Sequence, residues 1–143
     1  IYGMQDDDIR RKTDNLLQRL KFSEHRNSLV SDLPLGWKQK LAFSVSIFHN
    51  PGIVFLDEPT GGVDPATRRQ FWELICDAAE RGITVFVTTH YMDEAEYCDR
   101  ISIMVDGKIK ALGTPDELKR KLKQPDMDHV FTYLARQAVR SSD

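Results

Sequence analysis

The sequence predicts an α/β fold in which most strands of the sheet run parallel. Short apolar runs of strand length alternate with amphipathic stretches of helix length, which is typical of strand–helix–strand units. Two of the apolar runs, at 53–56 and 84–88, are continuous, as in strands that are buried on both faces of a parallel sheet. An Asp106-Gly107 pair then joins two further apolar runs, which indicates a hairpin near the C-terminal end.

The composition fits one globular domain. The chain has 143 residues, of which 41% are hydrophobic and 29% are charged. A net charge of −2 gives no global attraction to nucleic acid, so we expect no nucleic-acid partner. No apolar run approaches the roughly 20 residues that cross a bilayer. Cys76 and Cys98 lack metal-ligand spacing, so we expect reduced thiols in a cytosolic chain.

The N-terminal third is predicted to be helical. A first helix over 6–20 begins with three aspartates, which favour the positive end of the helix dipole. A polar loop over 21–32 leads to a second helix over 36–49, which Asn50-Pro51-Gly52 ends. The residues available for burial are Ile9, Leu16, Leu17 and Leu20 in the first helix and Trp37, Leu41, Val45 and Phe48 in the second.

Two more helices are expected around the second strand. Asp64 as N-cap and Pro65 in the first turn predict a helix over 65–80. A short acidic helix over 92–97 follows the second strand, and we expect its acids, Asp93, Glu94 and Glu96, to be solvated. The inward-facing residues of the longer helix are expected to be Phe71, Trp72, Ile75 and Ala79.

The C-terminal part is predicted to be a hairpin followed by two helices. The hairpin strands span 101–105 and 108–112. Thr114-Pro115-Asp116-Glu117 matches a capping box, with proline at the first helical position. A terminal helix over 127–139 is expected to carry Val130, Phe131, Leu134 and Ala138 on one face.

A pair of acids ends the first buried strand. Asp57 and Glu58 follow the four apolar residues at 53–56, and open α/β sheets bind their ligands at this end of their strands. Asp57 is suited to hold Mg2+, usually through a water, because Mg2+ prefers oxygen ligands and dehydrates reluctantly. Glu58 is suited to polarise a water that attacks a phosphate. Two acids alone would more often be a solvated strand end, but Pro59-Thr60-Gly61-Gly62-Val63-Asp64-Pro65 follows them.

That stretch resembles the Walker B strand, catalytic glutamate and D-loop of ABC ATPases. The resemblance implies that Asp64 ends the D-loop and touches the opposite subunit across a nucleotide sandwich, besides capping its helix. Thr89-His90-Tyr91-Met92-Asp93-Glu94-Ala95-Glu96 is similar to the switch region of transporter ATPases. A lone histidine after a strand is more often structural, but this resemblance implies that His90 reaches the terminal phosphate of ATP.

A third segment, residues 33–40, lies where this family carries its Leu-Ser-Gly-Gly-Gln signature, and we call it the signature segment. Pro34 replaces the serine and has neither a hydroxyl nor a backbone N–H. The N-terminus of the following helix can still attract phosphate, and Gly36 allows a close approach. The segment resembles a variant found in bacterial exporters of the ABC-2 drug-efflux kind. The resemblance implies these nucleotide-contacting residues: Leu33, Pro34, Leu35, Gly36, Trp37, Lys38 and, in the D-loop, Asp64.

The resemblance covers roughly 33–122 and implies that 1–143 is part of an ABC ATPase domain of the P-loop NTPase type. Residues 1–50 would end the helical subdomain, 51–122 would run from Walker B to the hairpin and its helix, and 123–143 would form a helical tail. The sequence contains no Gly-x-x-x-x-Gly-Lys-Ser/Thr loop, which would cradle the phosphates. We therefore expect about the first third of such a domain to lie upstream of Ile1.

The implied function is ATP binding and Mg2+-dependent ATP hydrolysis in a membrane transporter, which we expect to be an exporter. The expected partners are a membrane-spanning subunit and a second ATPase domain, identical or different, at the cytoplasmic face of the cell membrane. Two alternatives are a non-transport ABC ATPase of DNA repair or translation and a non-catalytic regulatory half of an ABC assembly. Without a phosphate loop, the chain by itself is expected to be inactive.

Overall fold

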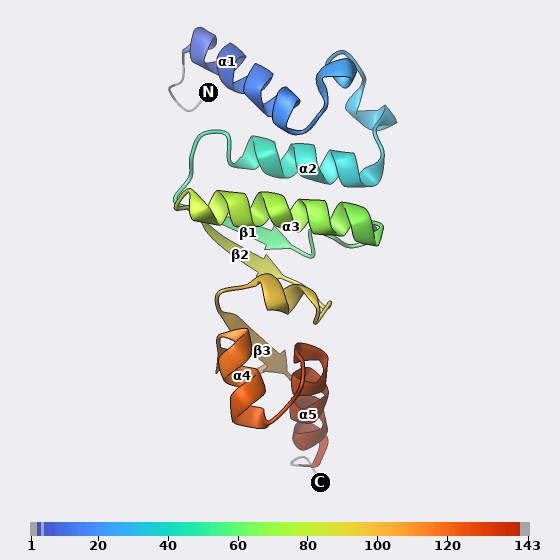
Figure 1. Cartoon of the computed structure of the whole chain (residues 1–143), viewed down its shortest axis with the longest axis vertical. Coiled ribbons are helices and arrows are strands. Elements are labelled where there is room, and N and C mark those ends of the chain that lie inside the picture. Colours follow the sequence, from blue (N-terminus) through green and yellow to red (C-terminus); the bar gives the residue numbers. More distant parts are fainter. Residues whose placement is uncertain (1–2, 4, 141–143) are drawn as a thin grey trace. The chain divides into compact units, whose positions relative to one another are not determined.

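A computed structural model describes residue 3 and residues 5–140, with side chains described through Ala138 (Figure 1). The chain divides into two units, residues 1–88 and residues 89–143. Helices and strands alternate in the first unit, and a hairpin precedes two helices in the second, which confirms the α/β class. No helix in the described ranges has the length and apolarity that a membrane crossing requires.

The first unit is built on a parallel strand pair. The strands β1 (Ile53–Asp57) and β2 (Thr84–Thr88) run in register, with Asp57 opposite Thr88. The helix α3 (Pro65–Glu80) connects them and lies against the strands, with α2 (Leu35–Ser46) beside it in Figure 1. The helix α1 (Asp6–Arg19) precedes them, and its predicted apolar face is half-buried. Two 3-10 turns lie in the loop before α2, at Ser23–His25 and Val30–Asp32.

The helix α3 begins as the sequence predicts. The carboxylate of Asp64 accepts a hydrogen bond from the Thr67 N–H at 3.0 Å, and Pro65 occupies the first turn. Its buried residues are Phe71, Trp72, Ile75 and Ala78. The expectation that Ala79 faces inward was wrong. The chain folds back after the helix, where the Ile83 N–H donates to the Ala78 carbonyl at 3.1 Å, so Ala78 is covered instead.

Of the residues expected to be buried on the second predicted helix, which corresponds to α2, Trp37, Leu41 and Phe48 are half-buried, but Val45 is not. Val45 is 57% exposed, and Phe43 and Ile47 are buried instead. The Phe43 ring packs on the ring of Phe71, with centroids 5.5 Å apart, which joins α2 to α3. The apolar residues of α2 lie on all sides of the helix, so the periodicity of its sequence alone could not predict which face is buried. The helix also ends at Ser46, three residues before the predicted end.

The sequence predicts that both faces of the parallel strands are buried, but the structure buries only one face. Val54 is buried, whereas Phe55 is 70% and Phe86 is 54% exposed. Alternate residues of a strand point to opposite faces, and α3 covers only one face of this pair. The rings of Phe55 and Phe86 lie 5.7 Å apart on the other face. An apolar sheet surface is therefore open in the first unit.

The second unit contains an antiparallel hairpin and two helices. The strands β3 (Ile101–Val105) and β4 (Lys108–Gly113) are joined by Asp106-Gly107, whose φ angles of +50° and +70° fit the predicted two-residue turn. The predicted capping box begins α4 (Pro115–Leu122), where Thr114 and Glu117 exchange hydrogen bonds of 3.0 and 3.1 Å. A 3-10 turn, η3 (Glu94–Tyr97), stands where a short helix was expected.

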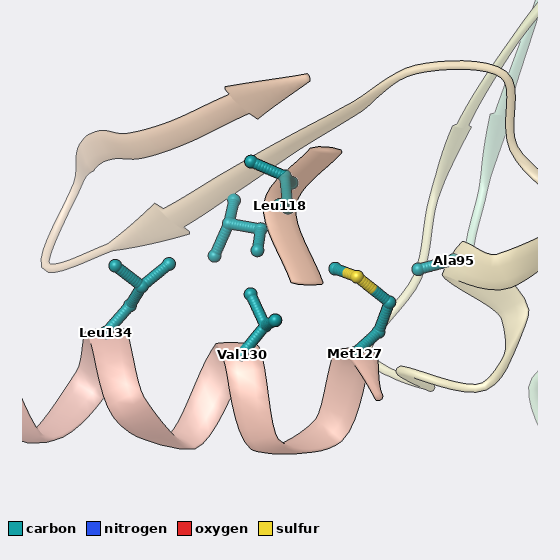
Figure 2. Close-up of a cluster of buried hydrophobic side chains, with 6 residues drawn as sticks. Ala95, Leu118, Met127, Val130 and Leu134 are labelled. Carbon is teal, nitrogen blue, oxygen red and sulfur yellow. The ribbon is translucent and has the colours of Figure 1, made fainter. Parts of the chain in front are cut away.

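The core of the second unit lies between the hairpin and the helices. The helix α5 (Met127–Arg140) directs Met127, Val130 and Leu134 toward the hairpin and toward Leu118 of α4 (Figure 2). This is the face that the sequence predicts, with Phe131 packed against the same cluster. The core also includes Ala95 of η3, so the segment that follows β2 is anchored in this unit.

Candidate active site

Asp57 lies at the carboxyl end of β1, where the register places it opposite Thr88. The Thr88 hydroxyl donates a hydrogen bond to Asp57 Oδ1, and the carboxylate is exposed. Two neighbouring strand ends thus hold one carboxylate at the rim of the sheet, where it can still reach solvent. Thr88 was not among the site residues predicted from the sequence, although its position at the end of the second parallel strand was a usable signal.

Glu58 adopts a backbone conformation that is unusual for its residue type. Its φ angle is +42°, a region that costs a non-glycine residue on the order of 1 kcal/mol. The Glu58 N–H donates to the carbonyl of Thr88 at 3.0 Å and lies 3.2 Å from the Thr88 hydroxyl oxygen. The Glu58 carbonyl accepts from the Gly61 N–H at 3.1 Å. These bonds hold a sharp turn that ends the strand at the exposed Glu58 side chain.

The D-loop continues this turn into α3. Thr60 is 1% exposed, and Gly62 has a φ angle of +76°, which favours glycine. Hydrogen bonds from Thr67 hold the pKa of Asp64 below its usual value. Asp64 is therefore an ionised helix cap at neutral pH, as its N-cap geometry suggests.

The signature segment forms the first turn of α2. Leu33 is buried, Pro34 occupies the N-cap position without a side-chain cap, and Leu35 is 51% exposed. Trp37 stacks on Phe22, with ring centroids 4.5 Å apart. Further contacts are an edge-on packing of His25 on Trp37 at 5.0 Å and a 2.7 Å hydrogen bond from Lys38 Nζ to the Ser31 carbonyl.

Gly36 is required for helix packing. A Cβ atom at this position would overlap the methyl group of Thr67 in α3. The absence of a side chain therefore lets the first turn of α2 approach α3 closely. The sequence predicts a close approach of Gly36 to a phosphate, and the structure shows in addition a close approach of α2 to α3.

The structure brings the signature segment and the D-loop together in the first unit. Gln39 Nε2 donates to the carbonyl of Gly61 at 3.4 Å. The next residue, the buried Lys40, donates to the side-chain oxygen of Gln70 in α3. Burial lowers the pKa of Lys40, and the carboxylates of Asp64 and Glu73 oppose that shift. Nothing in the sequence spacing indicated these contacts.

His90 belongs to the second unit. Its side chain is exposed, and its ring packs against the Tyr91 ring with centroids 4.1 Å apart. The Thr89 hydroxyl donates to Glu94 Oε2 at 2.6 Å and accepts from the Tyr91 N–H at 3.0 Å. Hydrogen bonds made by its neighbour therefore fix the backbone next to His90.

The expectation that three acids form a solvated face was wrong for Glu94. Glu94 is 0% exposed, whereas Asp93 and Glu96 are exposed and Glu96 pairs with Lys119 at 2.6 Å. A 3-10 turn places residues at other angles than an α-helix does, and here Glu94 lies beside the buried Ala95. Three acids within four residues are typical of an exposed segment, so the burial of Glu94 could not be predicted from this run.

The acidic residues suit a Mg2+ ion that arrives with phosphates. Within the described residues, no group of three His, Cys, Asp or Glu side chains could hold a metal ion. Mg2+ is commonly bound through one or two carboxylates, substrate phosphates and waters, and needs no cage of protein ligands. The exposed Asp57 carboxylate fits such a site.

Comparisons with known proteins place this geometry in a family. Residues 3–92 match the family described as "AAA domain, putative AbiEii toxin, Type IV TA system". The "Probable multidrug ABC transporter ATP-binding protein YbhF" of Escherichia coli (strain K12) is 46% identical over 139 residues, which are 94% of this chain and 24% of that protein. The human "Cholesterol transporter ABCA5" is 40% identical over 123 residues, which are 85% of this chain and 8% of that protein.

A solved structure, "Structure of ATP binding subunit of ABC transporter", shares the fold. Its TM-score is 0.77 at 26% identity, over 93% of this chain and 57% of that chain. The chain thus spans about a quarter of the bacterial relative's length and about half of the solved subunit. From the family match, the identities and the shared fold, we conclude that the chain belongs to the AAA-domain family and to the ATP-binding domains of ABC transporters.

Proposed function

We propose that this chain is part of the ATP-hydrolysing motor of an ABC exporter and carries its metal-binding and catalytic carboxylates. The observation that carries the proposal is the turn at the end of β1. There, Thr88 bonds both to the Asp57 carboxylate and to the backbone of Glu58, which has a φ angle of +42°. Backbone strain of this kind persists where the surrounding structure enforces it, and functional sites are common places for it.

The two carboxylates have separate roles in this proposal. Asp57 holds Mg2+, which when bound neutralises the negative charge of the phosphates. Glu58 orients the attacking water and polarises it as a general base. The Thr88 hydroxyl keeps the Asp57 carboxylate turned toward the rim of the sheet. In the second unit, His90 donates a hydrogen bond to the phosphate on which charge develops.

The signature segment and the D-loop are proposed to face the nucleotide of a second ATPase domain. The N-terminal turn of α2 offers backbone N–H groups and a positive dipole end to phosphate. Asp64 lies beside that turn and is exposed, so both can belong to one contact surface. The proposed surface consists of Leu33, Pro34, Leu35, Gly36, Trp37, Lys38 and Asp64.

The transport direction and the assembly rest on the relatives. YbhF is named as a multidrug transporter's ATP-binding protein and ABCA5 as a cholesterol transporter. Their similarity supports an exporter over a DNA-repair or translation ATPase. We infer a membrane-spanning partner subunit, a second ATPase domain, ATP with Mg2+ as cofactors, and a position at the cytoplasmic face of the cell membrane.

The test is Glu58→Gln in the complete ATPase subunit. The amide keeps the shape of the side chain but cannot act as a base, so steady-state ATP hydrolysis should fall by roughly a hundredfold or more. Binding of ATP, measured by equilibrium titration, should stay within about twofold of the unmodified protein, because the base acts on the water. Glu80→Gln at the exposed end of α3 is the matched control. Turnover near the unmodified level would exclude Glu58 as the catalytic base.

A further inference from the structure

Glu94 is a buried acid to which the proposed mechanism of ATP hydrolysis assigns no role. It is 0% exposed, and a buried carboxylate is costly unless hydrogen bonds or charges compensate it. The Thr89 hydroxyl donates a hydrogen bond to Glu94 Oε2 at 2.6 Å, which compensates part of that cost. A solvent-exposed glutamate at this position would not need such a partner.

The Thr89 hydroxyl has a second partner across His90. Its oxygen accepts a hydrogen bond from the Tyr91 N–H at 3.0 Å. The hydroxyl can donate only one proton, so donation to Glu94 leaves its lone pairs directed at the backbone N–H. The residues on both sides of His90 are thereby joined through one oxygen atom, and the backbone of His90 lies within that closed loop.

The anchor of this loop is itself fixed. Glu94 belongs to η3, and its neighbour Ala95 is part of the core cluster with Met127 and Leu118 (Figure 2). Glu94 also accepts at its backbone carbonyl from Cys98 Sγ, 3.9 Å away. A displacement of Thr89 would therefore require a displacement of a packed turn.

We propose that Thr89 and Glu94 are positioning residues that hold the backbone of His90 for its contact with phosphate. The proposal rests on the proposed function of His90. It assigns to Thr89 and Glu94 the role of fixing the backbone from which the His90 imidazole extends. Positioning matters because a misplacement of about 1 Å can slow a reaction a hundredfold. His90 itself is exposed, so its neighbours contribute much of its placement.

The experiment compares three single variants in the complete ATPase subunit. Thr89→Val keeps the shape but removes the hydroxyl, Thr89→Ser keeps the hydroxyl, and Glu94→Leu removes the buried acceptor. We expect Thr89→Val and Glu94→Leu each to lower kcat about tenfold or more with little change in KM for ATP, and Thr89→Ser to retain most of kcat. Thr84→Val, an exposed threonine of β2, is the control for the substitution itself.

A double-mutant cycle with His90→Ala separates positioning from general stability. If Thr89 acts through His90, then Thr89→Val should have no further effect on kcat once His90 is alanine. A readout without turnover is hydrogen exchange of the Tyr91 N–H, which should become faster in Thr89→Val and stay slow in Thr89→Ser. If the pair only stabilised the fold, Thr89→Val would change kcat by the same factor in both backgrounds, and thermal unfolding measures that contribution.

The outcomes distinguish the two proposals. If His90→Ala leaves kcat unchanged, the proposed function of His90 is wrong, and the positioning proposal fails with it. If His90→Ala slows hydrolysis but Thr89→Val does not, or if the two effects multiply, only the positioning proposal is overturned. A loss in Thr89→Val that disappears in the His90→Ala background supports both.

Discussion

Residue by residue, Thr88 contributes most to the geometry of the proposed site. Its hydroxyl donates to Asp57, and its carbonyl accepts from the Glu58 N–H at 3.0 Å. One residue of β2 therefore fixes the side chain of the metal ligand and the backbone of the catalytic base on β1. The strained φ angle of Glu58, at +42°, is held by these bonds and by the Gly61 N–H.

The metal role of Asp57 predicts a loss of Mg2+-dependent binding. Asp57→Asn removes the charge that attracts the cation but keeps an oxygen that can accept from Thr88. We expect the affinity for Mg-ATP in the complete subunit to fall about tenfold or more, with a smaller effect on ATP measured in the presence of EDTA. Isothermal titration with and without Mg2+ measures both affinities. An unchanged Mg2+ requirement would contradict the assignment, and Asp77→Asn, on α3, is a control.

Among the elements, α3 connects the D-loop to the core through its first turn. Asp64 caps the helix through Thr67, and Thr67 also fills the space left by Gly36 of α2. The cap, the D-loop and the signature helix thus share one contact region. A change in the first turn of α3 should therefore affect both nucleotide-facing segments.

The ionisation of Asp64 makes the stability of α3 depend on pH. Hydrogen bonds from Thr67 lower the folded-state pKa of Asp64 below its ordinary value of 3.8. A lowered pKa means that the charged cap stabilises the fold above pH 3.8 and that this contribution is lost as pH falls through the folded-state pKa. We expect Asp64→Ala to lower the urea midpoint of the complete subunit at pH 7, and the deficit to shrink below pH 3.8.

Asp64→Asn serves as the comparison for this cap. Asparagine is also a good N-cap but does not ionise, so its midpoint relative to alanine should not vary over the same pH range. A deficit of Asp64→Ala that stays constant from pH 7 through the acid range would show that the charge of Asp64 contributes nothing to the helix.

For the molecule as a whole, the exposed apolar face of the parallel strands is the feature that most favours self-association. Ile53, Phe55 and Phe86 are 49%, 70% and 54% exposed on β1 and β2. Exposed apolar side chains beside strands with unpaired backbone groups favour association. This exposure departs from the prediction that both faces of these strands are buried.

We predict that the 143-residue chain alone does not hydrolyse ATP and that it self-associates. Asp57, Glu58 and His90 can supply a metal ligand, a base and one donor, but phosphoryl transfer also requires groups that grip the phosphates. Phosphate release with Mg-ATP and sedimentation velocity test the two parts. The Phe55→Gln/Phe86→Gln double variant should sediment with a smaller associated fraction. Clear turnover by a monomer would show that the phosphate groups are not limiting.

The helices, strands and candidate site residues of this protein could be predicted from the sequence because they depend on local interactions. The cap at Asp64, the capping box at Thr114, the Asp106-Gly107 turn and the acids after β1 depend on neighbours within a few residues, so their patterns are visible in one dimension. The resemblance to ABC ATPases rests on the same short segments, and the comparisons confirm that family.

The covered faces and the side chains that meet depend on tertiary packing. The burial of Phe43 in place of Val45, the burial of Glu94 and the exposure of Phe55 depend on which element packs on which side. The bonds of Thr88 to Asp57 and of Gln39 to Gly61 join residues that are 31 and 22 positions apart. Periodicity shows that a segment has two kinds of face, but partners distant in sequence determine what each face contacts, and those partners are not encoded locally.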